Sequence, residues 1–256
     1  MSEIDATVLE AVDIKGLANQ QNIPYGLIIA FCIMSLWAAS LFLIANIDIS
    51  HLPIWLILLT MLWQTFLYTG LFITAHDAMH GSVFPQNPKI NNWVGSLAVS
   101  IYGGFSYKEL LKNHHYHHRY PASDRDPDFH DGTHKNPVSW YLYFMRRYFS
   151  WKQFLGLVVV LNSVRFLFHI PFPNLELFLG IPAILSSIQL FYFGTFLPHH
   201  EPDEGYQNPH RAQTNSLPMF LSFITCYHFG YHQEHHEYPH IPWWQLPKIH
   251  KLRASS

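Results

Sequence analysis

Two long runs without a charged residue constrain this chain more than any other feature of its sequence. Neither Tyr25–Asn46 nor Pro53–Ala75 contains an Asp, Glu, Lys or Arg. At about 1.5 Å per residue, helices of this length reach about 33 Å, enough to cross the hydrocarbon core of a bilayer. The short connection IDISHL between them indicates a helical hairpin. The alternative, a buried hairpin in a soluble protein, is disfavoured by the length of both runs.

A second pair of apolar segments follows at residues 154–170 and 175–197, separated by the break PFPN. Arg165 is costly within a span, so we expect it either to reach the headgroups or to face the interior and pair with Glu176 or a channel group. Residues 91–105 and 217–230 are apolar but short, which favours re-entrant or interfacial elements. The sequence therefore predicts an all-α membrane protein with four transmembrane helices in two hairpins.

Lys and Arg set the expected orientation. They are absent from the two short connections and occur in the long middle segment, residues 76–153, and after residue 198. Cytoplasmic loops carry the excess of Lys and Arg, so we expect a multi-pass protein with the middle segment and both termini in the cytoplasm. We further expect a short N-terminal cytoplasmic tail over residues 1–24 and one membrane-integral catalytic domain over residues 25–256.

The charge balance excludes one class of partner. Charged residues make up only 12% of the chain, and its formal net charge is −2. Nucleic acids are bound chiefly through a field of basic side chains that neutralises phosphates. The sequence offers no such field, so we predict no nucleic-acid partner.

Twelve of the 19 histidines lie in four groups near the predicted cytoplasmic ends of the spans. HDAMH ends the second span, LPHH ends the fourth, HHYHH lies in the middle segment and HFGYHQEHH follows the last span. Solvated histidines could explain one such group, but not four at one depth. The clustering predicts a histidine-rich cap on the cytoplasmic side.

The spacing within these groups is that of metal ligands on helices. Residues at i and i+3 or i+4 share a helix face, and neutral imidazole is a common ligand of zinc, copper and iron. Three helices then offer eight inward rings, too many for one ion, which indicates two. We add His199 as a ninth, because it ends a span at the same depth. The predicted metal ligands are His76, His80, His114, His117, His118, His199, His232, His235 and His236. Spacing alone permits zinc as well as iron.

Other polar groups near these motifs are expected to hold the ligands in place. Metal-bound imidazoles usually donate their second N–H to a carboxylate or carbonyl. The candidates for this supporting role are Asp77, His228, Glu234, Asp124 and Asp126. His228 could instead be a ligand, and the DRDPD turn could instead be a solvated loop. His115 and His200 point away from their neighbours' faces, so we expect them outside the ligand set.

The motifs HDAMH, HHYHH and HQEHH resemble the three histidine boxes of the membrane fatty-acid desaturase and hydroxylase superfamily. Longer stretches are similar to the bacterial and cyanobacterial β-carotene 4-ketolases (the CrtW type). They are HDAMHG, GGFSYKELLKNHHYHHRYPASDRDPDFH, FGTFLPHH and CYHFGYHQEHHEYPHIPWWQLP. The resemblance runs over roughly residues 25–250. No departure from the ketolase pattern is visible.

This resemblance implies two iron ions on the nine histidines, O₂ as co-substrate and no catalytic residue beyond the metal centre. It implies a carotenoid whose β-ionone ring is oxidised at carbon 4 by two successive hydroxylations and loss of water. The products would be echinenone and canthaxanthin, on the route to astaxanthin. The expected partners are β-carotene and related carotenoids, the lipid bilayer, and an electron donor such as ferredoxin or another reductase.

The chemistry of the substrate predicts an apolar slot for the ring. A C–H bond on a hydrocarbon offers no acid or base handle, so an activated oxygen must start the reaction. Candidate ring-binding residues are Trp63, Phe66, Phe72, Tyr102, Phe105, Phe191 and Phe196. The alternatives are a carotenoid 3-hydroxylase or a fatty-acid desaturase or hydroxylase on the same scaffold. Outside the enzymes, a histidine-rich metal transporter is a further alternative, although it would hold its ligands near the midplane of the membrane.

Overall fold

The computed structural model describes residues 24–254, which contain helices and no strand. The predicted tail, residues 1–24, lies almost wholly outside the described part. The first helices are α2 (Tyr25–Ile44), α3 (Ile54–Met79), α4 (Pro88–Gly103), α5 (Tyr107–Arg119), α6 (Pro137–Tyr148) and α7 (Trp151–Leu167). They are followed by α8 (Phe172–Leu175), α9 (Ile181–Phe191), α10 (Leu197–His199), α11 (Met219–Cys226), α12 (His232–Glu237) and α13 (Leu246–Ala254).

Short turns of other geometry join these helices. Ile49–His51 (η1) and Trp243–Gln245 (η4) are 3₁₀ turns, while Glu176–Gly180 (η2) and Tyr192–Phe196 (η3) are π-helical. The two π turns lie inside a continuous helix over Phe172–His199. Single π turns within α-helices are rare and are frequent at functional sites. Here η3 comes directly before α10, which carries His199.

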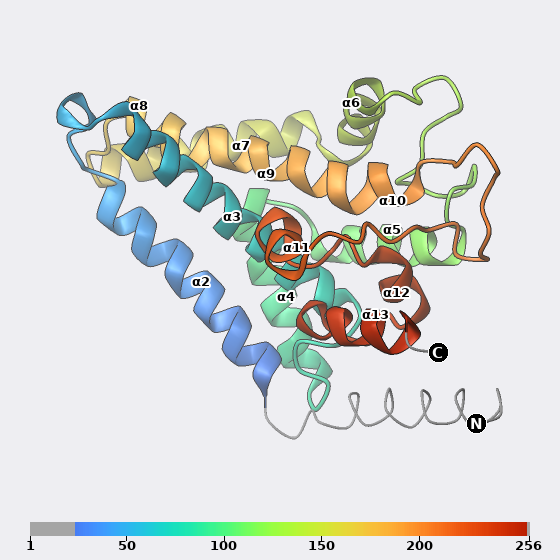
Figure 1. The fold of residues 1–256 in the computed structure, drawn as a ribbon. Helices are drawn as coiled ribbons and strands as arrows, with labels where there is room; N and C mark the ends of the chain where they lie inside the picture. The colour runs from blue at the N-terminus through green and yellow to red at the C-terminus, as the bar shows by residue number, and fades with distance from the viewer. Residues whose placement is uncertain (1–23, 255–256) are drawn as a thin grey trace.

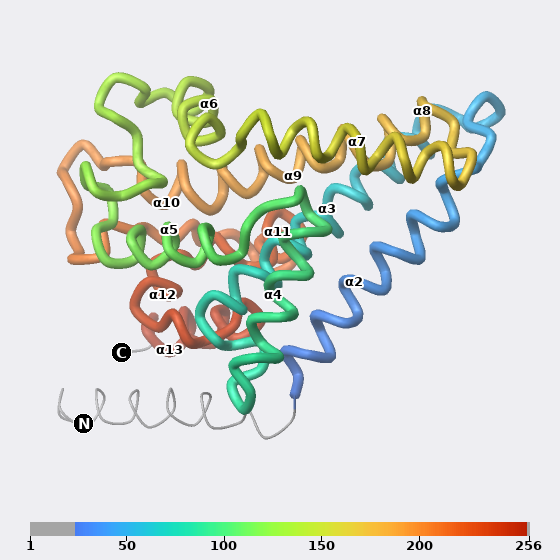
Figure 2. The backbone as a smooth tube through the Cα atoms, turned by 180° about the vertical axis from the view of Figure 1, so that it is seen from behind, coloured from blue at the N-terminus to red at the C-terminus, as the bar shows by residue number. Residues whose placement is uncertain are grey.

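The two predicted hairpins are present, and their turns meet at one end of the molecule. α2 and α3 form the first hairpin, and α7 and the α8–α9 helix form the second (Figure 1). The Asn174 side chain donates hydrogen bonds to the carbonyls of Ile44, Ala45 and Ile47 at 3.2, 3.1 and 2.9 Å. The α5, α12 and α13 helices lie at the opposite end, as the rear view also shows (Figure 2). The histidine motifs and the hairpin turns are therefore well separated.

Three helices are long and apolar enough to cross a membrane: Tyr25–Ile44, Ile54–Met79 and Phe172–His199. These match the first, second and fourth predicted spans. The third, α7, has 17 residues and would reach about 26 Å, short of the roughly 30 Å hydrocarbon core. The structure confirms an all-helical membrane protein with three candidate spans among the described residues.

The outward faces of these helices suit a lipid environment. Phe31 and Phe42 on α2 are 72% and 84% exposed, and Leu62 on α3 and Val159 on α7 are also exposed. The guanidinium of Arg165 lies over the rings of Phe166 and Phe172, and no ion pair joins it to Glu176 in the described part of the chain. Large apolar surfaces of this kind are unusual on soluble monomers. Such surfaces are those expected of helices that face lipid.

α3 is the central helix of the fold and positions the site. It packs against α2, α4 and α9, and its C-terminal half is almost wholly buried. Gly95 of α4 allows a close approach, since a Cβ there would lie 2.4 Å from Tyr107 and 2.7 Å from Ala78. The weakly apolar segments predicted at 91–105 and 217–230 form α4 and α11, both too short to be spans. The buried end of α3 carries the first histidine motif.

Candidate metal centre

The local sequence forms α5 so that its histidines point inward. The Ser106 side chain caps the helix by accepting the Glu109 N–H at 3.4 Å, after Gly104 ends α4 in a left-handed conformation with φ 66°. Glycine adopts this conformation without the steric strain that a side chain brings. His117 is buried, whereas His114 and His118 are half-buried. α5 thus supplies three rings to the interior.

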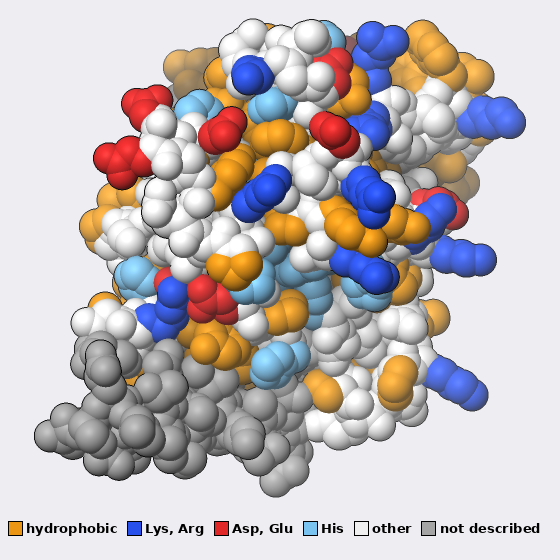
Figure 3. Space-filling view, turned by 90° about the vertical axis from the view of Figure 1, so that its right-hand side faces the viewer, with side chains coloured by type: hydrophobic (Ala, Val, Ile, Leu, Met, Phe, Trp, Pro, Cys, Tyr) orange, Lys and Arg blue, Asp and Glu red, His pale blue; other side chains and the backbone are white. Residues whose placement is uncertain are grey.

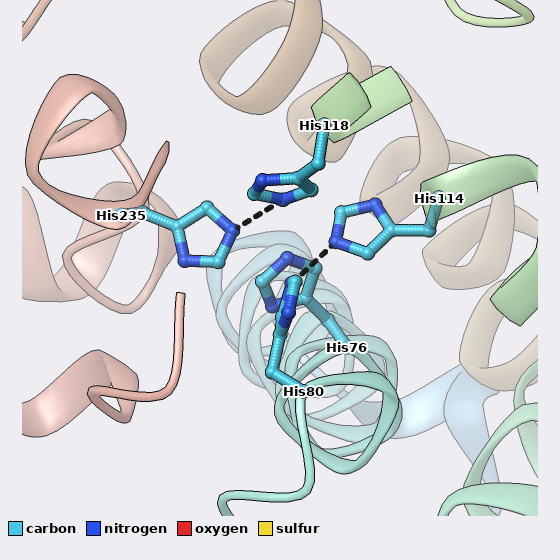
Figure 4. Close-up of side chains that lie close together, drawn as sticks. All are labelled: His76, His80, His114, His118 and His235. Atoms are coloured by element: carbon cyan, nitrogen blue, oxygen red, sulfur yellow. Dashed lines mark hydrogen bonds between the residues drawn. The ribbon is translucent and has the colours of Figure 1, made fainter. Parts of the chain in front are cut away.

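The first histidine group contains five rings from three helices. They are His76 and His80 of α3, His114 and His118 of α5, and His235 of α12, and their ligand atoms lie within 4.8 Å of one another. Figure 4 shows the rings turned toward a common centre. The Nε2 atoms of His80 and His114 are 2.7 Å apart, and those of His118 and His235 are 3.0 Å apart. We call this set the five-histidine group.

The second histidine group contains four rings, all buried. They are His117 of α5, His199 of α10, and His232 and His236 of α12, again with ligand atoms within 4.8 Å of one another. The Nε2 atom of His236 lies 3.1 Å from those of both His117 and His232, and that of His232 lies 3.0 Å from His199. We call this set the four-histidine group. Together the two groups contain all nine predicted ligands.

The geometry of both groups fits metal ions. An imidazole nitrogen lies about 2.1 Å from a bound first-row metal, so two ligands at right angles stand about 3.0 Å apart. The Nε2 separations of 2.7–3.1 Å in both groups match this value. Both ring nitrogens of His76, and Nδ1 of His232 and His236, are buried without a hydrogen-bond partner. Buried polar atoms that lack a partner are costly, and a bound ion would satisfy Nε2 of His76.

Electrostatics keep most of these rings neutral, which is the form that binds metal. Burial and the neighbouring histidines lower the pKa of His80 to about 3. The same causes hold the pKa values of His114, His118, His232, His235 and His236 well below the usual range. His117 differs: burial opposes its charged form, but Asp126 and Asp128 raise its pKa to about 9.

Asp126 orients the His117 ring through the Nδ1 atom, which faces away from the four-histidine group. The His117 Nδ1–H donates to the Asp126 carboxylate at 3.0 Å, which leaves Nε2 facing the four-histidine group. The same carboxylate accepts the backbone N–H groups of Ala122 at 2.9 Å and Asp128 at 2.8 Å. These bonds fix the carboxylate before any ion binds. Of the two readings of the DRDPD turn, the contacts favour the network that covers the site.

Asp128, which the sequence analysis did not single out, belongs to the same network. Its carboxylate lies 3.8 Å from His117 Nδ1 and accepts a hydrogen bond from the Tyr148 hydroxyl. Burial and the nearby Asp126 raise the pKa of Asp128 to about 6. The alternation of inward residues in DRDPD, two apart, is the sequence signal that could have found it. Asp124, which was singled out, is exposed.

The other predicted supporting residues lie at different distances from the rings. An Asp77 carboxylate oxygen is 3.5 Å from His76 Nδ1, and the other accepts the Trp243 N–H at 3.2 Å. Glu234 turns away and contacts Thr214 and His250 instead. His228 contacts Ser222 through Nδ1 at 3.1 Å. The structure therefore brings Asp77 and Asp126 to the histidine groups, but not Glu234 or His228. His199, in turn, donates from Nδ1 to the Arg211 carbonyl at 2.8 Å.

An apolar cavity of about 100 Å³ ends at both histidine groups. Its inner wall includes His76 and His114 of one group and His117 and His232 of the other. Its remaining wall comes from α3, α4, α5, α6, the α9–η3 region and three connecting segments: Phe72, Met79, Tyr102, Phe105, Leu110, Asp128, Phe144, Met145, Tyr148, Ser187, Leu190, Phe191, Gly194, Thr195 and Phe229. A molecule in this cavity touches both groups at once.

Four of the seven predicted aromatic residues line this cavity, namely Phe72, Tyr102, Phe105 and Phe191. Trp63 is 42% exposed on α3, and Phe66 stacks on Tyr227, so neither reaches it. Phe196 packs against Trp140 outside it. The sequence analysis missed Phe144 and Tyr148 of α6. Aromatic residues four apart, at 140, 144 and 148, were the signal, since this spacing puts them on one helix face.

Comparison with known proteins identifies the family. Residues 49–168 and 147–255 match the fatty acid desaturase family. The chain is 41% identical over 224 residues to a β-carotene ketolase of Paracoccus sp. (strain PC1), which covers 87% of this chain and 89% of the relative. The chain therefore belongs to the fatty acid desaturase family.

Two algal relatives are longer than this chain. A β-carotene 4-ketolase of Protosiphon botryoides is 40% identical, over 89% of this chain and 64% of the relative. A zeaxanthin 4-ketolase of Chlamydomonas reinhardtii is 39% identical, over 73% of this chain and 42% of the relative. The shared part includes most of the residues described above.

Proposed function

We propose that this member of the fatty acid desaturase family is an O₂-dependent β-carotene 4-ketolase. It oxidises carbon 4 of β-ionone rings and converts β-carotene to echinenone and canthaxanthin. One observation carries the proposal: in a chain 41% identical to a β-carotene ketolase, nine buried or half-buried imidazoles form two groups at the end of an apolar cavity. The enzyme class is therefore a non-haem oxidoreductase of carotenoid biosynthesis.

Two iron ions are the proposed cofactors, one on each histidine group. Groups of four or five imidazoles suit iron, and the family resemblance favours iron over the zinc that spacing alone would permit. Bound iron supplies the activation of O₂ that attack on an unactivated C–H bond requires. No carboxylate is needed in the ligand set, because the two groups already offer nine nitrogens.

The cavity positions the substrate. Phe72, Tyr102 and Phe105 form one side, and residues of α6 and α9 the other, so the hydrocarbon ring is held between aromatic walls. These walls exclude water and direct the end of the ring toward the histidines. Carbon 4 is allylic and carries the weaker C–H bond, and the ring's placement selects it over carbon 3.

Asp126 and Asp128 support the ligand His117 and take no part in the reaction of the substrate. Asp126 holds the His117 proton at Nδ1, so that Nε2 stays free to bind an ion. The Tyr148 hydroxyl donates to Asp128 and fixes that carboxylate at the cavity wall. Supporting groups of this kind commonly contribute about 10–100-fold to metal affinity or activity.

Each ring is oxidised twice at the same carbon. In each round O₂ inserts one oxygen atom into a C–H bond, and the second oxygen atom leaves as water after taking two electrons and two protons. The second round gives a geminal diol, which loses water to become the ketone. Four electrons per ring therefore come from outside the substrate, and we propose ferredoxin or a similar reductase as their source.

The proposed setting is the lipid bilayer with the histidine end in the cytoplasm. Apart from Arg165, Lys and Arg of the described residues lie outside the hairpin ends, in residues 76–153 and after residue 198, and the two short connections contain none, which supports this orientation. In this arrangement α7 completes a fourth span through local thinning of the bilayer, and residues 25–256 act as one catalytic domain. An insoluble substrate then reaches the cavity from lipid while electrons arrive from the cytoplasm.

Pigment analysis in cells that make β-carotene tests this function. Expression of the chain under air should produce echinenone and canthaxanthin, and anaerobic growth should suppress both. Zeaxanthin would indicate a 3-hydroxylase, and altered acyl unsaturation a desaturase. Either product in place of the ketones would overturn the proposal.

A matched variant separates the metal centre from protein loss. Replacing His117 by Ala removes a ring of the four-histidine group, whereas replacing the exposed His200 by Ala leaves both groups intact. The first variant should accumulate in the membrane without making ketones, and the second should make them at the normal level. Tight metal binding without substrate-dependent O₂ uptake would favour a metal-binding or transport protein.

A further inference from the structure

The outward face of α5, opposite the ligand histidines, carries a row of basic side chains. Lys108, Lys112, His115 and Arg119 are exposed and follow one another at intervals of four, three and four residues. This spacing places them in one stripe along the helix. Arg125 extends the stripe, because its guanidinium and that of Arg119 both lie over the Tyr120 ring, at 5.2 and 5.5 Å. We call these five residues the α5 stripe.

The inner face of the same helix holds both histidine groups. His114 and His118 belong to the five-histidine group, and His117 belongs to the four-histidine group. An α-helix with its side chains is about 10–12 Å across. A partner seated on the α5 stripe is therefore within about one helix diameter of either group.

Ion pairs do not neutralise the stripe, although the exposed Glu109 of α5 lies beside it. No ion pair joins Lys108, Lys112, Arg119 or Arg125 to a carboxylate in the described part of the chain. By contrast, Arg253 on α13 pairs with Glu234 and Glu237. Figure 3 looks onto the end of the molecule that carries α12 and shows blue side chains over much of its right half, with fewer red ones among them. The excess of blue side chains there gives a local positive charge despite the net charge of −2.

The reaction requires electrons from a partner, and the cavity side is taken by the substrate. Three of the five rings in the five-histidine group, His80, His114 and His118, are only half-buried, so this group is the one closer to solvent. Electron transfer slows steeply with distance, so a carrier must dock close to these rings. The α5 stripe offers that proximity on the side away from the apolar cavity walls of α6 and α9.

We propose that the α5 stripe is the docking surface for an acidic one-electron carrier protein. The proposal rests on the proposed ketolase function, because it concerns the electrons which that reaction consumes. Complementary charge steers such encounters and raises their rate, an effect that falls with ionic strength. The surface fits a small protein whose acidic side chains surround its redox centre.

A lipid surface fits this stripe less well. A helix that lies in the membrane interface buries an apolar face next to its basic one. Tyr116, at 46% exposed, is the single large apolar side chain of α5 that is exposed. The exposed apolar side chains lie on other helices, with Val138 and Leu142 on α6 and Trp151 on α7. The charge on α5 is therefore better matched by an acidic protein than by headgroups.

Charge reversal tests the docking surface. The full chain, purified in neutral detergent with β-carotene, is driven by an acidic [2Fe–2S] ferredoxin that NADPH and ferredoxin–NADP⁺ reductase keep reduced. The triple variant Lys108→Glu, Lys112→Glu, Arg119→Glu should raise KM for ferredoxin by about tenfold or more and flatten the dependence of rate on ionic strength. Its kcat at saturating ferredoxin should change little. The conservative triple Lys108→Arg, Lys112→Arg, Arg119→Lys should keep the wild-type KM.

A matched control carries the same charge change elsewhere. Lys135, Lys152 and Lys248 are exposed outside α5, and their replacement by Glu should leave KM for ferredoxin near the wild-type value. Equal KM values for the two glutamate triples would overturn the docking surface. So would a charge effect that arises only when phosphatidylglycerol is added, because the stripe would then bind lipid.

Failure of the docking surface is distinguishable from failure of the proposed function. A wild-type chain that makes ketones while the α5 triple keeps its KM refutes only the docking surface. A wild-type chain that makes no ketone with any donor refutes the function itself. Metal content serves as the folding control, and if the triple variant loses metal, Lys112→Glu alone should still raise KM by several-fold.

Discussion

The five-histidine and four-histidine groups share one kind of ligand but differ in their surroundings. All four rings of the second group are buried, and His117 and His199 are held from behind by a carboxylate and a carbonyl. In the first group three rings are half-buried, and the nearest carboxylate, Asp77, is 3.5 Å from His76. One group is therefore enclosed and rigidly supported, and the other is more open and offers one more ring.

This difference has a consequence for how each group tolerates change. Loss of one ring from the four-histidine group leaves three ligands, whereas loss of one from the five-histidine group leaves four. Both groups line the same cavity, so the reaction is expected to require both. The variants below are ordered by the size of the effect expected from this comparison.

The largest effect is expected from removing a ring from either group. His117→Ala and His235→Ala should each abolish ketone formation while the protein still accumulates in the membrane, because each opens one ion's coordination. Pigment analysis and membrane immunoblotting measure the two properties. Metal content should fall further in His117→Ala, whose group keeps only three rings. Full activity in either variant would remove that residue from the ligand set.

A smaller effect is expected from Asp126→Asn. The carboxamide keeps the shape but loses the charge and can present an N–H to His117 Nδ1, which disturbs the ring's tautomer. Metal affinity or activity should fall about 10–100-fold. Metal titration of the purified protein gives the affinity. An unchanged affinity would show that the buried carboxylate does not support the four-histidine group.

Asp77→Asn should have a weaker effect than Asp126→Asn. Asp77 lies farther from its imidazole, at 3.5 Å, and a carboxamide oxygen can still accept the Trp243 N–H. We expect a loss of a few-fold, below the roughly 10–100-fold range for a well-placed supporting group. The same metal titration compares the two variants. A larger loss for Asp77→Asn would reverse the ranking of the two groups.

The smallest effect on activity is expected from Glu234→Gln. Its carboxylate is as deeply buried as Asp126, but it contacts Thr214, His250 and Arg253 and no ring of either group. The free energy of unfolding should fall by about 1–3 kcal/mol, as for other hydrogen bonds to charged groups. Thermal unfolding measures this loss, and activity per folded molecule should stay near normal. A selective loss of metal would place Glu234 in the supporting network after all.

Much of the fold could be read from hydropathy, because crossing a bilayer demands long uncharged runs whatever the tertiary structure. The runs from Tyr25 and Pro53 became α2 and α3, and residues 175–197 lie within the Phe172–His199 helix. The bounds of the third predicted span, 154–170, were less accurate, since α7 begins and ends three residues earlier. This helix is also shorter than the other spans. The sequence analysis missed part of the cavity wall, because the aromatic residues of α6 lie on an amphipathic helix that hydropathy does not single out.

The sequence by itself determined which histidines face inward, because the i, i+4 pairs 76/80, 114/118 and 232/236 must share a helix face. Each of these pairs indeed stays within one group. The tertiary structure alone decided where the third ring of each HxxHH motif goes. His117 leaves its neighbours for the four-histidine group, and His235 leaves its own for the five-histidine group. Successive residues on a helix point about 100° apart, so the ring between two others reaches whichever centre the packing of α3, α10 and α12 places beside it.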